Sequence, residues 1–200
     1  MSISRGDTII EVMFAFATFS MVAVGAITIM NTGTALSQRS LEVTLVRQQI
    51  DAQADMVRFV HDSYLQEPAS TYGQLWQQMR SRAVTTPVQT SWGTCPVAFT
   101  NKFLLAPGSS TAADQSNNIA LLNESALSSA ATYSQLQVAP SAENSRAEGL
   151  WMDIRRAESV AGGGSAAQAY DVYIQSCWNS PGSSVPVTLN TLVRVYEPVN

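Results

Sequence analysis

Apolar residues follow three different patterns along the chain, and the first is an uncharged run from Val12 to Met30. Only a few threonine, serine and glycine residues interrupt this run. As a helix it would span about 28 Å, close to the hydrocarbon thickness of a bilayer. A helix that is apolar on every side needs lipid or other helices around it. We therefore predict a transmembrane helix over residues 7–34.

Residues 35–67 change to a one-sided pattern with the spacing of a single helix face. The recurring apolar residues are Val43, Val46, Ile50, Ala54, Val57, Val60 and Tyr64. The charged residues that occupy the other faces are Arg39, Glu42, Arg47, Asp51, Asp55, Arg58 and Asp62. Arg47 and Asp51 stand four residues apart, where a helix-stabilising ion pair is expected. This part is predicted to continue the helix past a weak point at Gly33 and to pack a globular domain on one side.

Residues 68–200 are predicted to form that globular domain. Pro68 is expected to end the long helix, and Thr71-x-x-Gln74 has the form of a capping box that opens a short helix. Val97 to Leu105 is predicted as a strand, because it is rich in Val and Phe and Pro107-Gly108 follows it. Residues 109–146 are rich in Ser, Ala, Asn and Gln, so we expect a surface excursion with short elements only.

The third pattern is a set of strand-like runs near the C-terminus. These runs are Leu150–Ile154, Tyr170–Trp178 and Val187–Tyr196, separated by turns at Gly162–Gly164 and Asn179–Ser184. They suit an antiparallel meander with one face packed on the helix stripe. The predicted fold class is α+β, with a long N-terminal helix packed on a C-terminal antiparallel sheet.

A very short polar leader precedes the apolar run. Met1 to Gly6 contains one basic residue, Arg5, and Glu11 is the last charge before the run. Gly6 has no side chain to hinder a protease that approaches the backbone. Gly33-Thr34-Ala35 offers a conventional secretory cleavage site before Leu36, although the apolar run is longer than such signals usually have. A plain signal anchor that tethers a domain is a further alternative.

The segment Arg5-Gly6-Asp7-Thr8-Ile9-Ile10-Glu11-Val12 resembles the prepilin peptidase site of type IV pilins and pseudopilins. In that family a short basic leader ends in Gly, and a Glu follows the new terminus by four residues at the start of an apolar helix. The resemblance implies cleavage between Gly6 and Asp7, N-methylation of Asp7 and the pilin fold. Asp7 departs from the family, which most often has Phe at this position. The strict match covers about ten residues, and the helix pattern extends it over roughly the first sixty.

Glu11 has two explanations that the sequence leaves open. The resemblance implies that it pairs with the free N-terminal amine of a neighbouring subunit during assembly. A carboxylate at the edge of an apolar helix is costly in lipid unless it is paired. Alternatively, Thr8-x-x-Glu11 is a capping box, with Thr8 as the N-cap.

The two cysteines, Cys95 and Cys177, lie after the apolar run. If that run is an export signal or an anchor, both thiols reach an oxidising compartment, where a disulfide is the expected outcome. Such a bridge would stabilise the domain by roughly 4 kcal/mol in the chain-entropy model. The alternative is a pair of unpaired buried thiols.

Composition and motifs argue against catalysis and against nucleic-acid binding. The net charge is −4 and only 13% of residues are charged, so no basic patch is indicated. His61 is the single histidine and is interpreted as a surface or packing residue, since no nucleophile motif accompanies it. No zinc ligand set, calcium loop or phosphate loop is recognised around Asp114, Asn117-Asn118 or the glycine run. We expect no enzyme activity, no cofactor and no metal, and core roles for Trp151 and Trp178.

The sequence therefore predicts a structural subunit of an extracellular type IV pilus, major or minor. As the resemblance implies, prepilin peptidase would process residues 1–6 away, and an inner-membrane assembly platform would polymerise the chain with other pilin subunits. Before assembly it would be a single-pass protein of the cytoplasmic membrane, surrounded by lipid. Adhesion and twitching motility are roles of the family. The alternatives are a pseudopilin of a secretion or DNA-uptake system, or a signal-anchored extracytoplasmic binding module.

Overall fold

The computed structural model describes residues 7–84, 94–108, 119–157 and 168–198. The chain divides into two compact units, Met1–Leu41 and Glu42–Asn200. The described part of the first unit is helical, and the second unit contains the rest of the same helix together with the strands. The predicted turn at Gly162–Gly164 lies outside the described residues.

Helix α1 (Asp7–Gln66) is 60 residues long. It runs through Gly33 without interruption, so the predicted weak point does not break it. It ends two residues before Pro68, because proline disfavours helical geometry in the residue that precedes it. The Glu67 N–H donates to the Ser63 carbonyl at 2.9 Å and completes the last turn.

The one-sided apolar stripe of α1 is confirmed within Glu42–Asn200. Val46, Val57 and Val60 are fully buried, and Ile50 and Ala54 are nearly so. The two ends of the stripe, Val43 and Tyr64, are partly buried against the same core. Burying this stripe is the main link between α1 and its domain, since buried apolar area stabilises at about 25 cal/mol per Å².

The opposite face of α1 carries exposed charges, but the predicted ion pair between Arg47 and Asp51 is wrong. Neither residue forms an ion pair with any described residue. Instead Arg58 pairs with Asp55, three residues earlier, at 2.8 Å. Both pairings have helix-neighbour spacing, so small side-chain preferences decide between them.

Helix α2 (Thr71–Arg80) follows after a short turn. Its N-cap is Ser70 and not the predicted Thr71: the Ser70 hydroxyl accepts a hydrogen bond from the Gly73 N–H at 3.0 Å. A Cβ at Gly73 would meet the Pro68 carbonyl oxygen at 2.5 Å, so the first turn of α2 needs a glycine at this position. The predicted buried face is confirmed, with Leu75, Trp76 and Met79 buried and Tyr72 partly buried.

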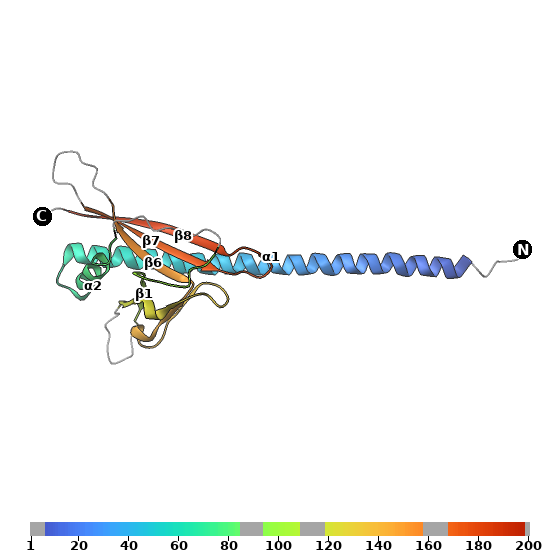
Figure 1. Ribbon diagram of the computed structural model, residues 1–200, viewed down its shortest axis with the longest axis horizontal. Helices are drawn as coiled ribbons and strands as arrows, with labels where there is room; N and C mark the ends of the chain where they lie inside the picture. The colour runs from blue at the N-terminus through green and yellow to red at the C-terminus, as the bar shows by residue number, and fades with distance from the viewer. Residues whose placement is uncertain (1–6, 85–93, 109–118, 158–167, 199–200) are drawn as a thin grey trace, which may run out of the picture. The chain divides into compact units, whose positions relative to one another are not determined.

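The main sheet consists of β6 (Leu150–Arg156), β7 (Gln168–Trp178) and β8 (Val187–Glu197) in that order. All pairings are antiparallel, and β7 pairs with β8 along its whole length. Figure 1 shows these strands side by side along the second part of α1. Their inward residues, including Met152, Ile154, Ile174 and Val193, share one core with the α1 stripe. The predicted α+β fold, a long helix packed on a C-terminal antiparallel sheet, is confirmed.

Smaller elements complete the second unit. Strand β1 (Leu104–Pro107) pairs with β2 (Ile119–Leu122), and a second small sheet has the order β3-β5-β4. The remaining elements are η1 (Glu124–Ala126), β3 (Leu127–Ser128), β4 (Gln135–Gln137), η2 (Ala142–Asn144) and β5 (Arg146–Glu148). This confirms the expectation of short elements for the described part of residues 109–146.

Only the last residues of the predicted Val97–Leu105 strand form a strand, since β1 begins at Leu104. Val97 is 90% exposed, and a turn in which the Lys102 N–H donates to the Phe99 carbonyl at 3.0 Å interrupts the run. Asn101 in this turn has φ of 59°, a left-handed conformation that an asparagine tolerates better than most residues. Phe103 then forms an isolated bridge with Met152, at the edge of the main sheet.

Candidate functional site

The first part of α1 presents apolar side chains on every side. Between Ile9 and Leu41, which we call the exposed apolar segment, the structure buries no side chain. Phe14, Phe19 and Met21 are among the large residues exposed there, and Met21 is 79% exposed. The helix is long and apolar enough to cross a membrane. A surface of this size and composition requires a partner that is itself apolar.

Most hydroxyl groups of the exposed apolar segment are satisfied within the helix. Thr18 donates to the Phe14 carbonyl at 3.0 Å, and Ser20 donates to the Phe16 carbonyl at 2.7 Å. The same contact with the preceding turn is made by Thr28, Thr32 and Thr34. These hydroxyls therefore need no water, which suits a helix surrounded by hydrocarbon or by other helices.

Glu11 is the one carboxylate of the exposed apolar segment. Its side chain is exposed, and no residue in the described part of the chain forms an ion pair with it. Asp7 is the first residue of α1, whereas Gly6 lies outside the described residues. The structure does not describe the Thr8 side chain, so both explanations of Glu11 stay predictions.

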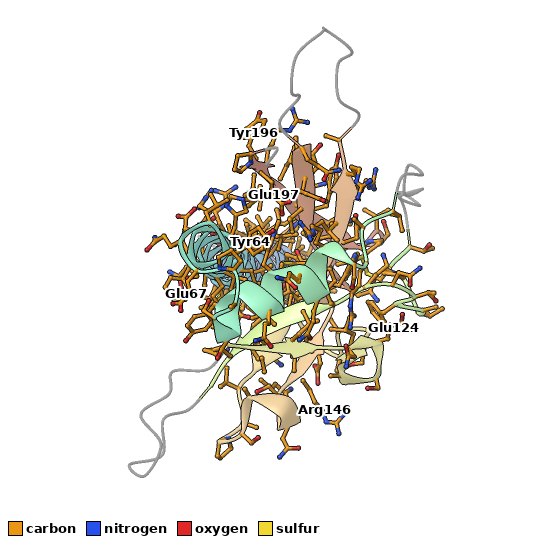
Figure 2. All side chains as sticks on the ribbon, turned by 90° about the vertical axis from the view of Figure 1, so that its left-hand side faces the viewer. Tyr64, Glu67, Glu124, Arg146, Tyr196 and Glu197 are labelled. Atoms are coloured by element: carbon orange, nitrogen blue, oxygen red, sulfur yellow. A yellow bond between two sulfur atoms is a disulfide. The ribbon has the colours of Figure 1, made fainter. Side chains whose placement is uncertain are left out.

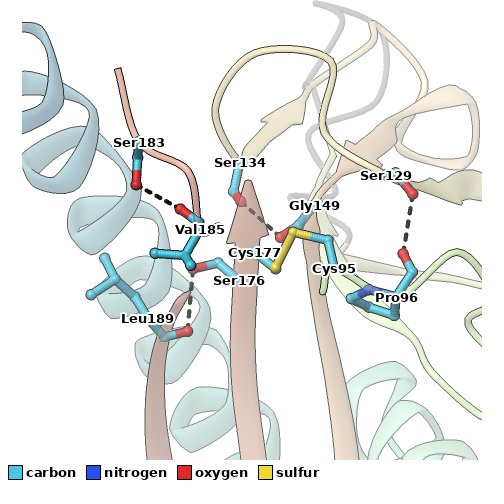
Figure 3. Close-up of a disulfide and its surroundings, with 10 residues drawn as sticks. All are labelled: Cys95, Pro96, Ser129, Ser134, Gly149, Ser176, Cys177, Ser183, Val185 and Leu189. Carbon is cyan, nitrogen blue, oxygen red and sulfur yellow. Dashed lines mark hydrogen bonds between the residues drawn. A yellow bond between two sulfur atoms is a disulfide. The ribbon is translucent and has the colours of Figure 1, made fainter. Parts of the chain in front are cut away.

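The Cys95–Cys177 disulfide is present, as predicted, and it ties the start of the strand-rich region to the end of β7. The S–S distance is 2.05 Å, and the bridge closes a separation of 82 residues. Figure 3 shows it beside Gly149, whose carbonyl accepts from the Ser134 hydroxyl and from the Cys177 N–H, each at 2.8 Å. Gly149 has φ of 63°, and a Cβ there would meet the Cys177 carbonyl oxygen at 2.5 Å. A glycine is therefore required at position 149, where the end of β7 meets the disulfide.

Two polar side chains of α1, Gln49 and Gln53, attach the helix to the strands, and sequence reasoning missed both of them. Gln53 is 1% exposed; its amide donates to the Leu105 carbonyl at 2.8 Å and accepts from the Leu105 N–H at 3.2 Å. Gln49 accepts from the Leu136 N–H at 2.7 Å. An amide side chain can both donate and accept, so Gln53 completes a strand edge as another backbone would. The detectable signal was the spacing of Gln49 and Gln53, four residues apart along the edge of the stripe.

Glu42, a charged residue outside the apolar stripe, also attaches α1 to the domain. It is half-buried, and its Oε2 accepts from Trp178 Nε1 at 2.9 Å and from the Ser180 hydroxyl at 2.7 Å. A carboxylate that accepts two hydrogen bonds from one strand end is a strong attachment, since charge-assisted bonds are stronger than neutral ones. Glu42 therefore secures α1 to the end of β7.

A second polar cluster joins α2 to the last strand. Glu197 is buried; it accepts from Trp76 Nε1 and from Arg80 at 2.8 Å. Arg80 also donates to the Tyr64 hydroxyl at 3.3 Å, and Figure 2 shows Tyr64 and Glu197 above α2, on the side of α1 and the main sheet. His61 packs edge-to-face on Trp76 with ring centroids 5.0 Å apart, so its predicted packing role is confirmed. These contacts hold the end of the chain on the domain.

The outer face of β6 carries an unusual group of charges. Asp153 is buried; it accepts from Gln175 at 2.7 Å and lies 3.4 Å from Arg155, and Lys102 stacks 4.9 Å above the Trp151 ring. Burial raises the pKa of the Asp153 carboxyl, while Arg155 and Lys102 oppose that rise. Burial also lowers the pKa of the Lys102 ammonium group. The positive charges of Arg155 and Lys102 therefore offset part of the cost of burying the Asp153 carboxylate.

Candidate metal and catalytic residues are not brought together. No group of three His, Cys, Asp or Glu side chains within the described ranges could hold a metal ion. Asp114, Asn117-Asn118 and Trp92 lie outside those ranges. Trp76, Trp151 and Trp178 are buried, which confirms the core role predicted for the last two.

Comparison with protein families, curated proteins and solved structures found no match. The residues and contacts of this chain are therefore what indicates its function. Its main feature is the exposed apolar segment, which is fused through one continuous helix to a domain with its own core and disulfide.

Proposed function

We propose that this chain is a structural subunit of a type IV pilus-like filament. Prepilin peptidase would cleave between Gly6 and Asp7, and the chain would then leave the membrane by packing α1 against α1 of other copies. The observation that supports this most is the exposed apolar segment itself. It presents apolar side chains on every side, and most of its hydroxyls bond within the helix. Glu11, which has no ion-pair partner among the described residues, lies near its start.

Glu11 has a defined part in this proposal. At the end of an apolar segment an unpaired carboxylate is costly, and pairing with an amine removes much of that cost. At about 4 Å such a pair is worth roughly 4 kcal/mol at an effective dielectric near 20, before desolvation. The free amine of Asp7 in a neighbouring copy is the group that processing would create. Glu11 would therefore select the register between copies.

The first test is the mass of the chain in filaments sheared from the surface of cells that express it. We expect a chain that begins at Asp7, with or without one added methyl group. A chain that begins at Leu36 would indicate a secretory signal, and a chain that keeps Met1 would indicate a membrane anchor. A processed chain found only as a dispersed monomer, beside fibres made of other subunits, would refute the proposal.

The second test separates the two explanations of Glu11. A capping box works with Gln as well as with Glu, whereas an ion pair needs the charge. We expect Glu11→Gln to leave membrane insertion intact and to lower filament incorporation by at least about tenfold, because the lost pair is worth several kcal/mol. Thr8→Ala is the matched control, since it removes the cap and keeps the charge. If Glu11→Gln is incorporated normally, Glu11 acts only as a helix cap.

A further inference from the structure

A charged stripe runs along the exposed side of α1, and we define it as Arg47, Asp51, Asp55, Arg58 and Asp62. These residues are spaced at four, four, three and four positions, so they share one side of the helix. All are exposed, because the buried stripe of Val46, Ile50 and Val57 lies on the other side. The charged stripe is therefore free to meet another molecule.

The charges of this stripe are only partly paired within the chain. Arg58 and Asp55 pair at 2.8 Å, using one carboxylate oxygen, Oδ1. Asp62 lies 3.5 Å from His61 Nδ1, and its side chain is still 68% exposed. Arg47 and Asp51 have no ion-pair partner among the described residues, although their spacing would allow one. Charges of both signs thus lie along one exposed helix face, and two of them, Arg47 and Asp51, have no ion-pair partner among the described residues.

We propose that the charged stripe is a contact surface for a second copy of this chain, in parallel and shifted by four residues along the helix. The shift places Arg47 of one copy level with Asp51 of the next, and Arg58 level with Asp62. This inference rests on the proposed function, in which copies pack helix to helix with their sheets outward. In such an assembly the exposed side of α1 turns toward neighbouring helices.

Charge complementarity selects this shift over an unshifted arrangement. With no shift, each residue of the stripe meets its own copy, and every contact joins like charges. A shift of four residues, about 6 Å, creates two attractive contacts and one like pair, Asp51 with Asp55. Arg58 already offsets the charge of Asp55 within its own chain, which weakens that repulsion. The contact between Glu11 and the Asp7 amine also joins positions four residues apart, so one shift satisfies both.

Exposed ion pairs contribute modestly to affinity but strongly to register and partner choice. A head-to-tail contact of this kind repeats from copy to copy and generates an open filament. The apolar segment would supply most of the attraction between copies. The charged stripe would make the four-residue shift more stable than neighbouring shifts that bury the same apolar surface.

Charge variants in filament-forming cells test the stripe. We expect Arg47→Gln to lower the filament yield by about threefold, as the loss of an exposed pair allows. Gln48→Glu is the matched control, because it makes the same change in net charge at the adjacent position. The combination Arg47→Asp with Asp51→Arg should restore the yield, since the swapped charges still attract across the contact. Equal yields for Arg47→Gln and its control, or no recovery in the combination, would overturn the inference.

Crosslinking tests the shift itself and separates this inference from the proposed function. Cells that express Arg47→Cys and Asp51→Cys copies together should give covalent dimers in their filaments. A mixture of Arg47→Cys and Asp62→Cys copies should give few covalent dimers, because the four-residue shift leaves these two positions far apart along the helix. If the second mixture gives the dimers, or neither does, the four-residue shift is wrong, while filaments that begin at Asp7 would still support the proposed function. If no filament contains the chain, both proposals fail.

Discussion

Ile29 and Ile50 lie on the same helix but have opposite surroundings. Ile29 is 73% exposed, whereas Ile50 is 4% exposed and belongs to the core that α1 shares with the sheet. The polar residues of the two parts differ in the same way. Hydroxyls such as Thr28 bond back to their own helix, whereas the Gln53 amide reaches out to a strand. In the first part of α1, polar side chains are satisfied by the helix itself. In the second part, they are satisfied by other elements of the domain.

This difference shows how one helix can serve two environments. Where polar side chains satisfy themselves, the surface is left purely apolar, and it can exchange lipid for other helices at little polar cost. Where polar side chains bond to strands, the helix is held in one position relative to its own domain. Substitutions should therefore affect folding in the second part and assembly in the first.

The largest expected effect comes from removing the disulfide. Replacing both cysteines, Cys95→Ser with Cys177→Ser, should lower the free energy of unfolding of the domain by roughly 4 kcal/mol, because the bridge closes a separation of 82 residues. Chemical denaturation in detergent, followed by tryptophan fluorescence, would measure this. Helicity of the exposed apolar segment should be unchanged, and an equal loss there would contradict the separation between the two parts of α1.

The most direct test of the comparison is a matched pair of substitutions. Ile50→Ala should lower the free energy of unfolding by about 3 kcal/mol, since it leaves a cavity in the core. Ile29→Ala removes the same atoms from an exposed position and should change it by less than about 0.5 kcal/mol. Denaturation of both full-length variants in detergent micelles would measure this. Comparable losses would mean that Ile29 is packed within the monomer.

A somewhat smaller effect is expected at Gln53. The substitution Gln53→Leu replaces the amide with an apolar side chain of similar size. It leaves the Leu105 N–H and carbonyl without their partner, which should cost about 2 kcal/mol. Gln48→Leu is the control, because Gln48 is exposed on the same helix. Hydrogen exchange at Leu105 should rise in the first variant and stay unchanged in the control. Unaltered exchange would show that the strand edge does not depend on Gln53.

The smallest expected effect is a pH dependence of Asp153. Burial raises the pKa of this carboxyl in the folded chain, so the folded state binds its proton more tightly than the unfolded state does. The contribution of Asp153 to the free energy of unfolding is therefore present below the usual pKa of an aspartic acid. It is lost as the pH rises through the raised pKa. The unfolding free energy of the native chain, minus that of Asp153→Asn, should fall over this interval. A difference that rises with pH would mean that Arg155 and Lys102 outweigh burial.

The sequence predicted those elements that are set by local pattern. The helix over the first part of the chain, its buried stripe from Val46 to Val60, the three long strands and the buried face of α2 all follow from periodicity. It failed where nearly equal local options compete. Ser70 caps α2 in place of Thr71, Arg58 and not Arg47 finds a partner, and a turn at Asn101 shortens the strand expected after Val97.

The sequence by itself determined that residues 12–30 are apolar on every side, that the pattern becomes one-sided after them and that two cysteines were available to pair. These properties depend on the order of residue types, and any folded form of the chain must satisfy them. Only the tertiary structure decided which polar groups join the helix to its domain. Glu42, Gln53 and Glu197 have partners in segments far away in the sequence, and hydrogen bonds between distant segments depend on a geometry that periodicity does not encode.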